Sequence, residues 1–208
     1  MPWKALTLLG DAVLVVPLLA GLAVWLRVRP AAPRLSNTEL LRWAGIAAAS
    51  LALVAGSKIA FYGWGTGIRR WDLTCFSGHA VLAWLLWPVL FALLVPPQRR
   101  ALRVTATLAG AALAIMVAWS RVPIGAHPPS EVIAGMALGV CACVFTLYLL
   151  RRLALDLPGV AVAAGLAGTL VVGSTQAMPR PDTERWFAKA GVALSGAEKP
   201  QSRRHWRD

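Results

Sequence analysis

The sequence predicts an all-α membrane protein, a polytopic bundle of six transmembrane helices. Of the 208 residues, 58% are hydrophobic and only 14% are charged, a composition unlike that of a soluble domain. Charged residues are confined to short segments, and most of the gaps between them approach the roughly 20 apolar residues with which a helix crosses a bilayer. These gaps lack the period-2 alternation of membrane barrel strands. Helices are therefore expected, since they satisfy every backbone hydrogen bond within lipid.

Six apolar segments form the predicted transmembrane domain, residues 1–179. They cover residues 5–26, 43–57 with a possible extension over 59–64, 79–98, 104–120, 132–150 and 157–178. The first segment is longer than the apolar core of a signal peptide and has no clear cleavage site, so we interpret it as a helix. Asp11 interrupts it, and either reaches for the interface or pairs with Lys58, Arg69 or Arg70.

Small residues favour close packing in the fifth segment. Gly135 and Gly139 lie four residues apart, which places them on one face of a helix and lets a neighbouring backbone approach. Residues 180–208 form a separate, basic polar tail with a short amphipathic stretch around Trp186, Phe187 and Leu194. We expect this tail to be interfacial or disordered.

The loop charges predict an orientation. Nine Lys and Arg residues lie in the first, third and fifth connections, against five on the opposite side, and such residues are enriched in short cytoplasmic loops. The second and fourth loops are therefore expected on the outer, periplasmic face of an inner membrane, although the basic tail would then lie outside as well.

That outer face gathers the chemistry-bearing side chains. It contains His79 and His127, two of the three histidines, together with Lys58 and Arg121. Ionisable groups at the ends of membrane helices are costly and usually functional. Imidazoles among cations at a bilayer surface indicate an anionic lipid headgroup, above all a phosphate. The net charge of +12 does not indicate nucleic acid, because it is spread over two membrane faces rather than one patch.

Two motifs in these loops make the hypothesis specific. Ser77-Gly78-His79 opens the third segment, and Ser120-Arg121, five residues, His127, three residues, Glu131 opens the fifth. Over residues 58–139 the chain resembles the type 2 phosphatidic acid phosphatase family, whose motifs read K-x6-R-P, P-S-G-H and S-R-x5-H-x3-D. Here Phe76 replaces the proline of the second motif and Glu131 the aspartate of the third.

The first motif departs further from the family pattern. The residue seven positions after Lys58 is Gly65, and the nearest arginines are Arg69 and Arg70. Either arginine is a candidate to complete the phosphate clamp. The family also more often places two helices before its first motif, whereas one precedes it here.

The resemblance implies a role for each motif residue. His127 would be the nucleophile that forms a phosphohistidine, Glu131 would hold the proton of its other nitrogen, and His79 would protonate the leaving oxygen. Lys58 and Arg121 would bind phosphoryl oxygens. Ser77 and Gly78 would add donors at a helix N-terminus.

Structural roles are open for several of the same residues. Glu131 could only favour a helix start, Lys58 could extend to the interface, and Ser77 is expected to cap its helix in addition. None of the cysteines Cys75, Cys141 and Cys143 has a paired metal-ligand spacing, and we expect neither metal nor cofactor.

The predicted function is metal-independent hydrolysis of an anionic lipid by an integral membrane phosphatase. The resemblance implies a lipid phosphate or diphosphate, such as undecaprenyl diphosphate, phosphatidylglycerol phosphate, phosphatidate or a lipid A phosphate. Phosphotransfer to another lipid is an alternative. So is a non-catalytic lipid-phosphate binder or transport protein that has kept the basic pocket.

Overall fold

The computed structural model is all-helical. It describes residues 2–30, 32–156 and 182–203, with a few single positions between 158 and 168. Within these residues there are seven α-helices and a short 3₁₀ helix, and the sole strand-like pairing is an isolated bridge between Ile68 and Leu73. The helices are α1 (Pro2–Leu8), α2 (Ala12–Val28), α3 (Asn37–Trp64), η1 (Arg69–Trp71), α4 (Gly78–Leu93), α5 (Arg100–Trp119), α6 (Pro129–Leu149) and α8 (Thr183–Ser195).

The helices account for five of the six predicted segments. α3, α5 and α6 are long and apolar enough to cross a membrane, while α2 and α4 are apolar but shorter. The all-α class is therefore confirmed, together with a membrane character. The predicted sixth segment, 157–178, lies almost wholly outside the described residues, so the six-helix count stays a prediction, as does the division into 1–179 and 180–208.

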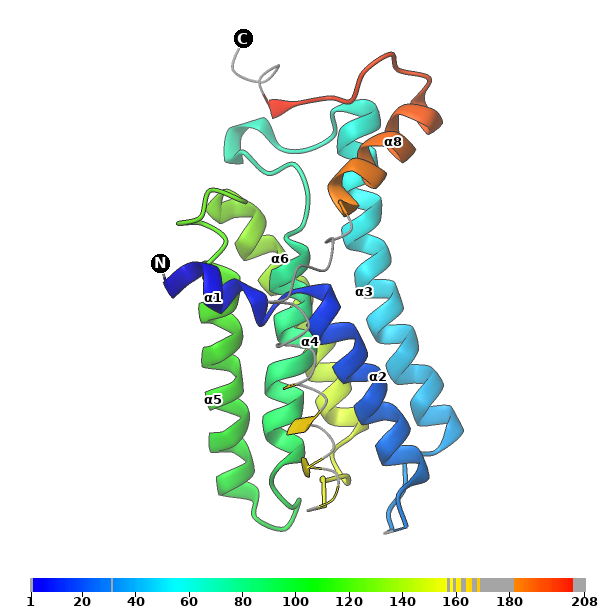
Figure 1. Ribbon diagram of the computed structural model, residues 1–208, viewed down its shortest axis with the longest axis vertical. Coiled ribbons are helices and arrows are strands. Elements are labelled where there is room, and N and C mark those ends of the chain that lie inside the picture. Colours follow the sequence, from blue (N-terminus) through cyan, green and yellow to red (C-terminus); the bar gives the residue numbers. More distant parts are fainter. Residues whose placement is uncertain are drawn as a thin grey trace.

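The first predicted segment is two helices rather than one. α1 ends at Leu8, and Asp11 then begins α2 by accepting a hydrogen bond from the backbone N–H of Val13 at 3.0 Å. α1 lies across the end of α5 (Figure 1). Asp11 is thus the N-cap of α2, a role that was not predicted for it.

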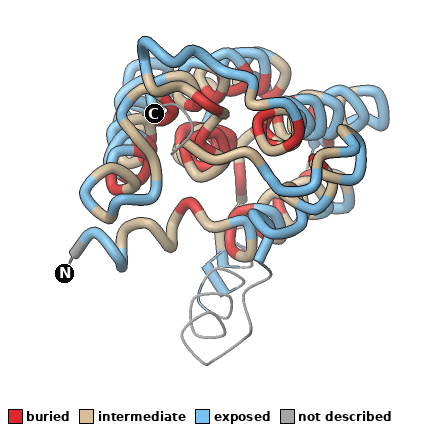
Figure 2. Tube along the Cα trace, turned by 90° about the horizontal axis from the view of Figure 1, so that it is seen from above, coloured by how far each residue is buried: buried red, intermediate tan, exposed pale blue. Residues whose placement is uncertain are grey.

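α4 is the central helix of the bundle. It packs against α2, α3, α5 and α6, and its side chains are buried around nearly the whole circumference. The buried residues gather around this centre when the bundle is viewed from above (Figure 2). A helix that is apolar on every side is stable in this place because every face meets another helix.

Two glycines set the spacing between α6 and α4, as the sequence predicts. A Cβ at Gly135 would lie 2.8 Å from the carbonyl oxygen of Ser77, and one at Gly139 would lie 2.7 Å from Cβ of Trp84. Any larger residue would push the helices apart. This contact brings the start of α6 against the start of α4.

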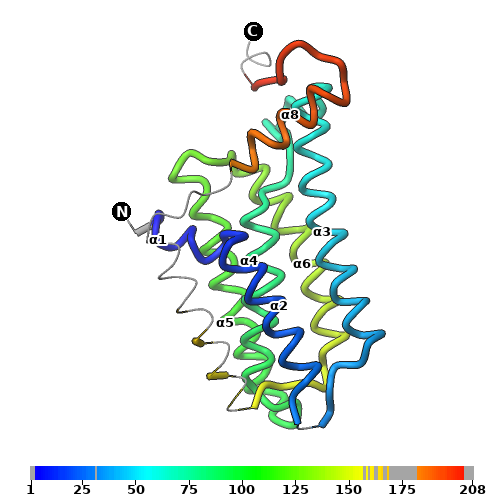
Figure 3. The backbone as a smooth tube through the Cα atoms, turned by 45° about the vertical axis from the view of Figure 1, so that its right-hand side comes forward, coloured from blue at the N-terminus to red at the C-terminus, as the bar shows by residue number. Residues whose placement is uncertain are grey.

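The C-terminal stretch contains a docked helix, which excludes a tail that is disordered over residues 182–203, while its place at the membrane interface stays a prediction. α8 packs on the end of α3 (Figure 3). Gly191 and Gly63 meet there, because a Cβ on Gly191 would lie 2.8 Å from the backbone nitrogen of Gly63. The chain then turns back, and the N–H of Gln201 donates to the carbonyl of Tyr62 at 2.8 Å.

Candidate active site

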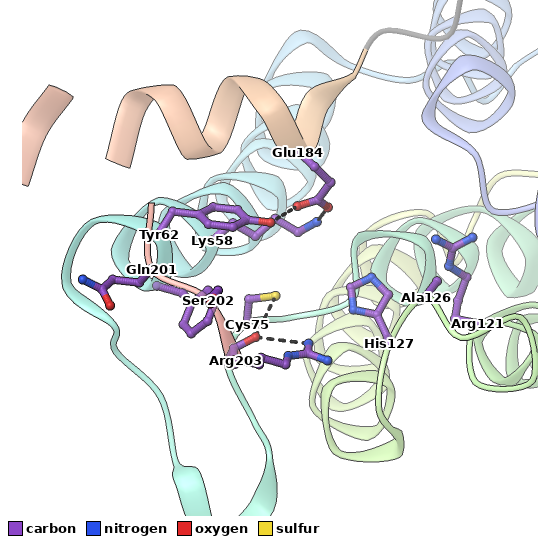
Figure 4. Close-up of a pocket in the computed structure, with 12 residues that line it drawn as sticks. Lys58, Tyr62, Cys75, Arg121, Ala126, His127, Glu184, Gln201, Ser202 and Arg203 are labelled. Atoms are coloured by element: carbon purple, nitrogen blue, oxygen red, sulfur yellow. Dashed lines mark hydrogen bonds and ion pairs between the residues drawn. The ribbon is translucent and has the colours of Figure 1, made fainter. Parts of the chain in front are cut away.

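A polar cavity of about 450 Å³ opens where the loops before α4 and α6 meet the end of α3 and the C-terminal segment (Figure 4). Its polar lining includes three cations and a histidine beside one carboxylate. The lining residues used below are Lys58, Tyr62, Cys75, Arg121, His127, Glu184 and Arg203. Three residues predicted for the site, Lys58 from one segment of the sequence and Arg121 and His127 from another, thus share one cavity.

His127 and Glu131 form the closest pair in the site. Glu131 Oε2 lies 2.6 Å from His127 Nδ1, four residues back along the chain. The other oxygen, Oε1, accepts hydrogen bonds from the backbone N–H groups of Thr74 at 3.0 Å and Cys75 at 3.2 Å. The glutamate is therefore long enough to reach the histidine and the loop before α4 together. An ionised Glu131 keeps a proton on Nδ1 and leaves the lone pair on Nε2.

The start of α4 lies directly beside this pair. The backbone N–H of Ser77 donates to the carbonyl of Glu131 at 3.2 Å. Ser77 occupies the N-cap position, but its hydroxyl makes no capping bond, contrary to expectation, and it is buried with no hydrogen-bond partner in the described part of the chain. A buried hydroxyl without a partner is costly, and at a helix N-terminus it suits an anion.

A second cavity, of about 520 Å³, continues from the first. It shares Lys58, Arg121, His127 and Glu184 with the polar cavity and also contains Gly78 and His79. Its remaining lining is largely apolar and comes from α2, α3, α4 and α8, including Val13, Leu51, Val54, Leu82 and Phe187. His79 therefore lies on the side of His127 where the lining becomes apolar.

Arg121 lines both cavities. Its Nη1 donates to Thr7 Oγ1 at 2.8 Å, while Nε is buried and makes no hydrogen bond within the described residues. Burial lowers the pKa of Arg121, and the charges of Asp11 and Glu184 oppose that shift. An unpaired guanidinium N–H in a buried site favours binding of an anion.

Lys58 lies in the cavity but is already paired. Its side chain is almost fully buried, and its ammonium forms an ion pair with Glu184 of α8. Glu184 also accepts a hydrogen bond from the Tyr62 hydroxyl at 3.0 Å. A phosphate that binds Lys58 must therefore compete with this carboxylate.

Ligand atoms of Cys75, His127 and Glu131 lie within 4.8 Å of one another, an arrangement that the sequence spacing did not suggest. The surrounding charges oppose a cation there. Burial and the charge of Glu131 raise the pKa of the Cys75 thiol to about 11, so the thiol is protonated at neutral pH, and Arg203 is ion-paired with Glu131 Oε1 at 2.6 Å. A metal ion would have to displace both the proton and the arginine.

Glu184 and Arg203 were not predicted for the site. Neither belongs to a motif, and both lie in the segment expected to be interfacial or disordered. The motif resemblance instead left two arginines of the loop after α3, Arg69 and Arg70, as candidates to complete the clamp. These are exposed in and around η1 and line neither cavity, and Arg70 lies against the ring of Trp71. The only available signal was the amphipathic stretch near Trp186, which shows that α8 has a face to bury.

Comparisons with known proteins show the family of the chain. A family model described as the PAP2 superfamily matches residues 58–154, which contain the histidine motifs. The chain is also 38% identical over 152 residues to an uncharacterized 22.5 kDa protein in the cps region of Klebsiella pneumoniae, covering 73% of this chain and 71% of that protein. No solved structure matches the chain. The chain belongs to the PAP2 superfamily, the family of type 2 phosphatidic acid phosphatases that its motifs resemble.

Proposed function

We propose that the protein is a membrane phosphatase that hydrolyses a lipid phosphate or diphosphate through a phosphohistidine at His127. One observation carries this proposal. The pairing of Glu131 Oε2 with His127 Nδ1 at 2.6 Å leaves Nε2 as a nucleophile in a cavity that also contains Lys58 and Arg121.

The proposed reaction has two steps. His127 Nε2 attacks phosphorus and forms a P–N bond while the bond from phosphorus to the lipid oxygen breaks, and His79 gives a proton to that oxygen. Water then attacks the phosphohistidine, the P–N bond breaks, and inorganic phosphate leaves. Water passes one proton back to His79, which restores the starting state. Lys58, Arg121, Ser77 and Gly78 stabilise the phosphoryl oxygens.

The apolar cavity favours a lipid over a soluble phosphate. It joins the phosphate site at His79 and is lined by apolar side chains from α2, α3 and α4, helices that are apolar enough to lie within a membrane. The leaving oxygen and its attached apolar chain would lie on that side, next to the proposed proton donor. Phosphate release from a panel of lipids will identify the headgroup and the length of the lipid chain.

The chemistry needs no metal. The cations of the site are side chains, and the Cys75, His127 and Glu131 cluster already holds a thiol proton and an arginine. We expect chelator to leave the rate unchanged.

The decisive experiment measures phosphate release by detergent-purified protein with chelator present. The panel contains undecaprenyl diphosphate, phosphatidylglycerol phosphate, phosphatidate and a lipid A phosphate, each with and without a second lipid as acceptor. His127→Ala should abolish release, whereas Thr105→Ala, at an exposed position on α5, should not. Transfer only to the acceptor lipid would make the protein a phosphotransferase. Binding without turnover by a folded protein would make it a lipid-phosphate binder.

We also propose that this site faces the periplasm from the inner membrane. Support comes from the loop charges, with basic residues in excess on the opposite face. Thr66 is exposed in the loop between α3 and η1, so Thr66→Cys should react with a membrane-impermeant thiol reagent in intact cells whose outer membrane is permeable to it. Labelling only after lysis would reverse the orientation.

A further inference from the structure

The C-terminal segment, residues 182–203, enters the site although it lies outside the family match at 58–154. Close contact between Gly191 and Gly63 fixes α8 on α3. The backbone bond from Gln201 to Tyr62 then places the following residues over the polar cavity. Figure 4 shows the Arg203 side chain extending toward His127.

Arg203 contacts the residue that holds His127. Its Nη2 lies 2.6 Å from Glu131 Oε1 and 3.3 Å from Thr74 Oγ1. The Glu131 side chain is fully buried, while Arg203 is one-third exposed. The two carboxylate oxygens of Glu131 thus have different partners. Oε1 contacts Arg203 and the loop before α4, and Oε2 contacts His127.

The charges give this contact a function. A buried carboxylate stays ionised through hydrogen-bond donors together with a positive partner. The backbone N–H groups of Thr74 and Cys75 supply donors to Glu131, and a positive charge is still needed to balance it. His127 must be neutral when it attacks phosphorus, so it cannot supply that charge in the reactive state. Among the ion pairs of the described residues, Arg203 is the permanently charged partner of Glu131.

The charge of Glu131 affects the nucleophile because it determines which ring nitrogen of His127 carries the proton. An ionised Glu131 accepts the proton of Nδ1 and leaves Nε2 free to attack. A protonated Glu131 would instead donate to Nδ1, and the ring proton would move to Nε2, where it blocks attack.

We propose that Arg203 is a positioning residue that acts through Glu131 to keep His127 in its nucleophilic tautomer. This inference rests on the proposed function. It differs from a phosphate clamp, because the Nη2 contacts of Arg203 are to Glu131 and Thr74. It also differs from a simple tether, because the contacts from Gln201 and Gly191 already attach the segment.

The test compares Arg203→Ala and Arg203→Lys with Lys199→Ala, a basic and exposed control in the same segment. Arg203→Ala should lower kcat by about tenfold to a hundredfold, in the range seen when a supporting hydrogen-bond partner is lost, and change KM little. Arg203→Lys should recover part of the rate, because the charge remains. Guanidinium ion, added far below denaturing concentrations, should rescue Arg203→Ala and leave Lys199→Ala unchanged.

A double variant makes the test sharper. In a Glu131→Gln background, Arg203→Ala should cause no further loss of kcat, because residues that act as one unit are not additive. The inference is overturned by an equal loss in both backgrounds, or by a raised KM with kcat unchanged, which would indicate direct phosphate binding. Wild-type protein that releases no phosphate from any lipid would be recognised separately. It would overturn the proposed function, and this inference with it.

Discussion

Two regions supply the charges of the site, and they are held in place by different contacts. The motif loops are attached to the central bundle, where Gly135 packs against the start of α4. The C-terminal segment packs mainly on the end of α3, through Gly191 and Gln201, and reaches the motif loops through Arg203. The first region lies within the family match and the second outside it. In the proposed mechanism the motif loops therefore carry the reacting groups, whereas Arg203 adjusts them from a segment that packs outside the central bundle.

The largest effect is expected inside the bundle. Glu131→Gln keeps the size of the side chain, but its amide can donate to His127 Nδ1 and favour the wrong tautomer. We expect kcat to fall by about 10³-fold to 10⁴-fold and KM to change far less, as measured by steady-state phosphate release. An unchanged rate would show that Glu131 only favours the start of α6. The motif loops would then not hold the nucleophile as the comparison of the two regions assumes.

A matched pair of glycine substitutions tests the two attachments directly. A Cβ at either Gly135 or Gly191 meets backbone at 2.8 Å. Gly135→Val should destabilise the bundle by about 1–3 kcal/mol and lower activity by about a hundredfold, because it displaces the motif residues. Gly191→Val should release α8 while the bundle keeps its melting temperature, and activity should fall by no more than in Arg203→Ala.

Thermal melting and limited proteolysis distinguish these outcomes. Cleavage within residues 182–203 should accelerate in Gly191→Val only. If both variants lower the melting temperature equally, the C-terminal segment belongs to the core of the fold and is not detachable.

A smaller effect is expected at Glu184, which competes with phosphate for Lys58. Glu184→Gln should lower KM by about twofold to fivefold, the fold-change that corresponds to the free energy of a half-exposed ion pair. Glu198→Gln, which changes an exposed acid of the same segment, should leave KM unchanged. A raised KM in Glu184→Gln would show instead that the carboxylate helps to orient Lys58 for the substrate.

The smallest effect on activity is expected at Cys75. Its pKa is raised from 9.0 to about 11, so at neutral pH it carries about a hundredfold less thiolate than an ordinary thiol. Alkylation should be slow near pH 7 and should accelerate as the pH rises toward 11, while Thr66→Cys in the neighbouring loop reacts rapidly. Cys75→Ser should retain most of the rate. Rapid alkylation at neutral pH would show a thiolate and reopen the question of a metal ion.

The helical class and the membrane character follow from the sequence, because both depend on the composition of local segments. The pairing of His127 with Glu131 was implied by the resemblance of the third motif, and the two side chains do meet in the structure. Gly135 was expected at a helix contact, because small residues reveal where a neighbouring backbone approaches.

What surrounds that pair depends on the tertiary structure. Asp11 caps α2 at a break that lies beside His79, and Ser77 lies against α6 without a capping bond. Glu184 and Arg203 are 126 and 72 residues from Lys58 and Glu131, their partners in the site. No local pattern encodes such pairings, because they depend on where α8 docks, and a few glycine contacts between distant segments determine that.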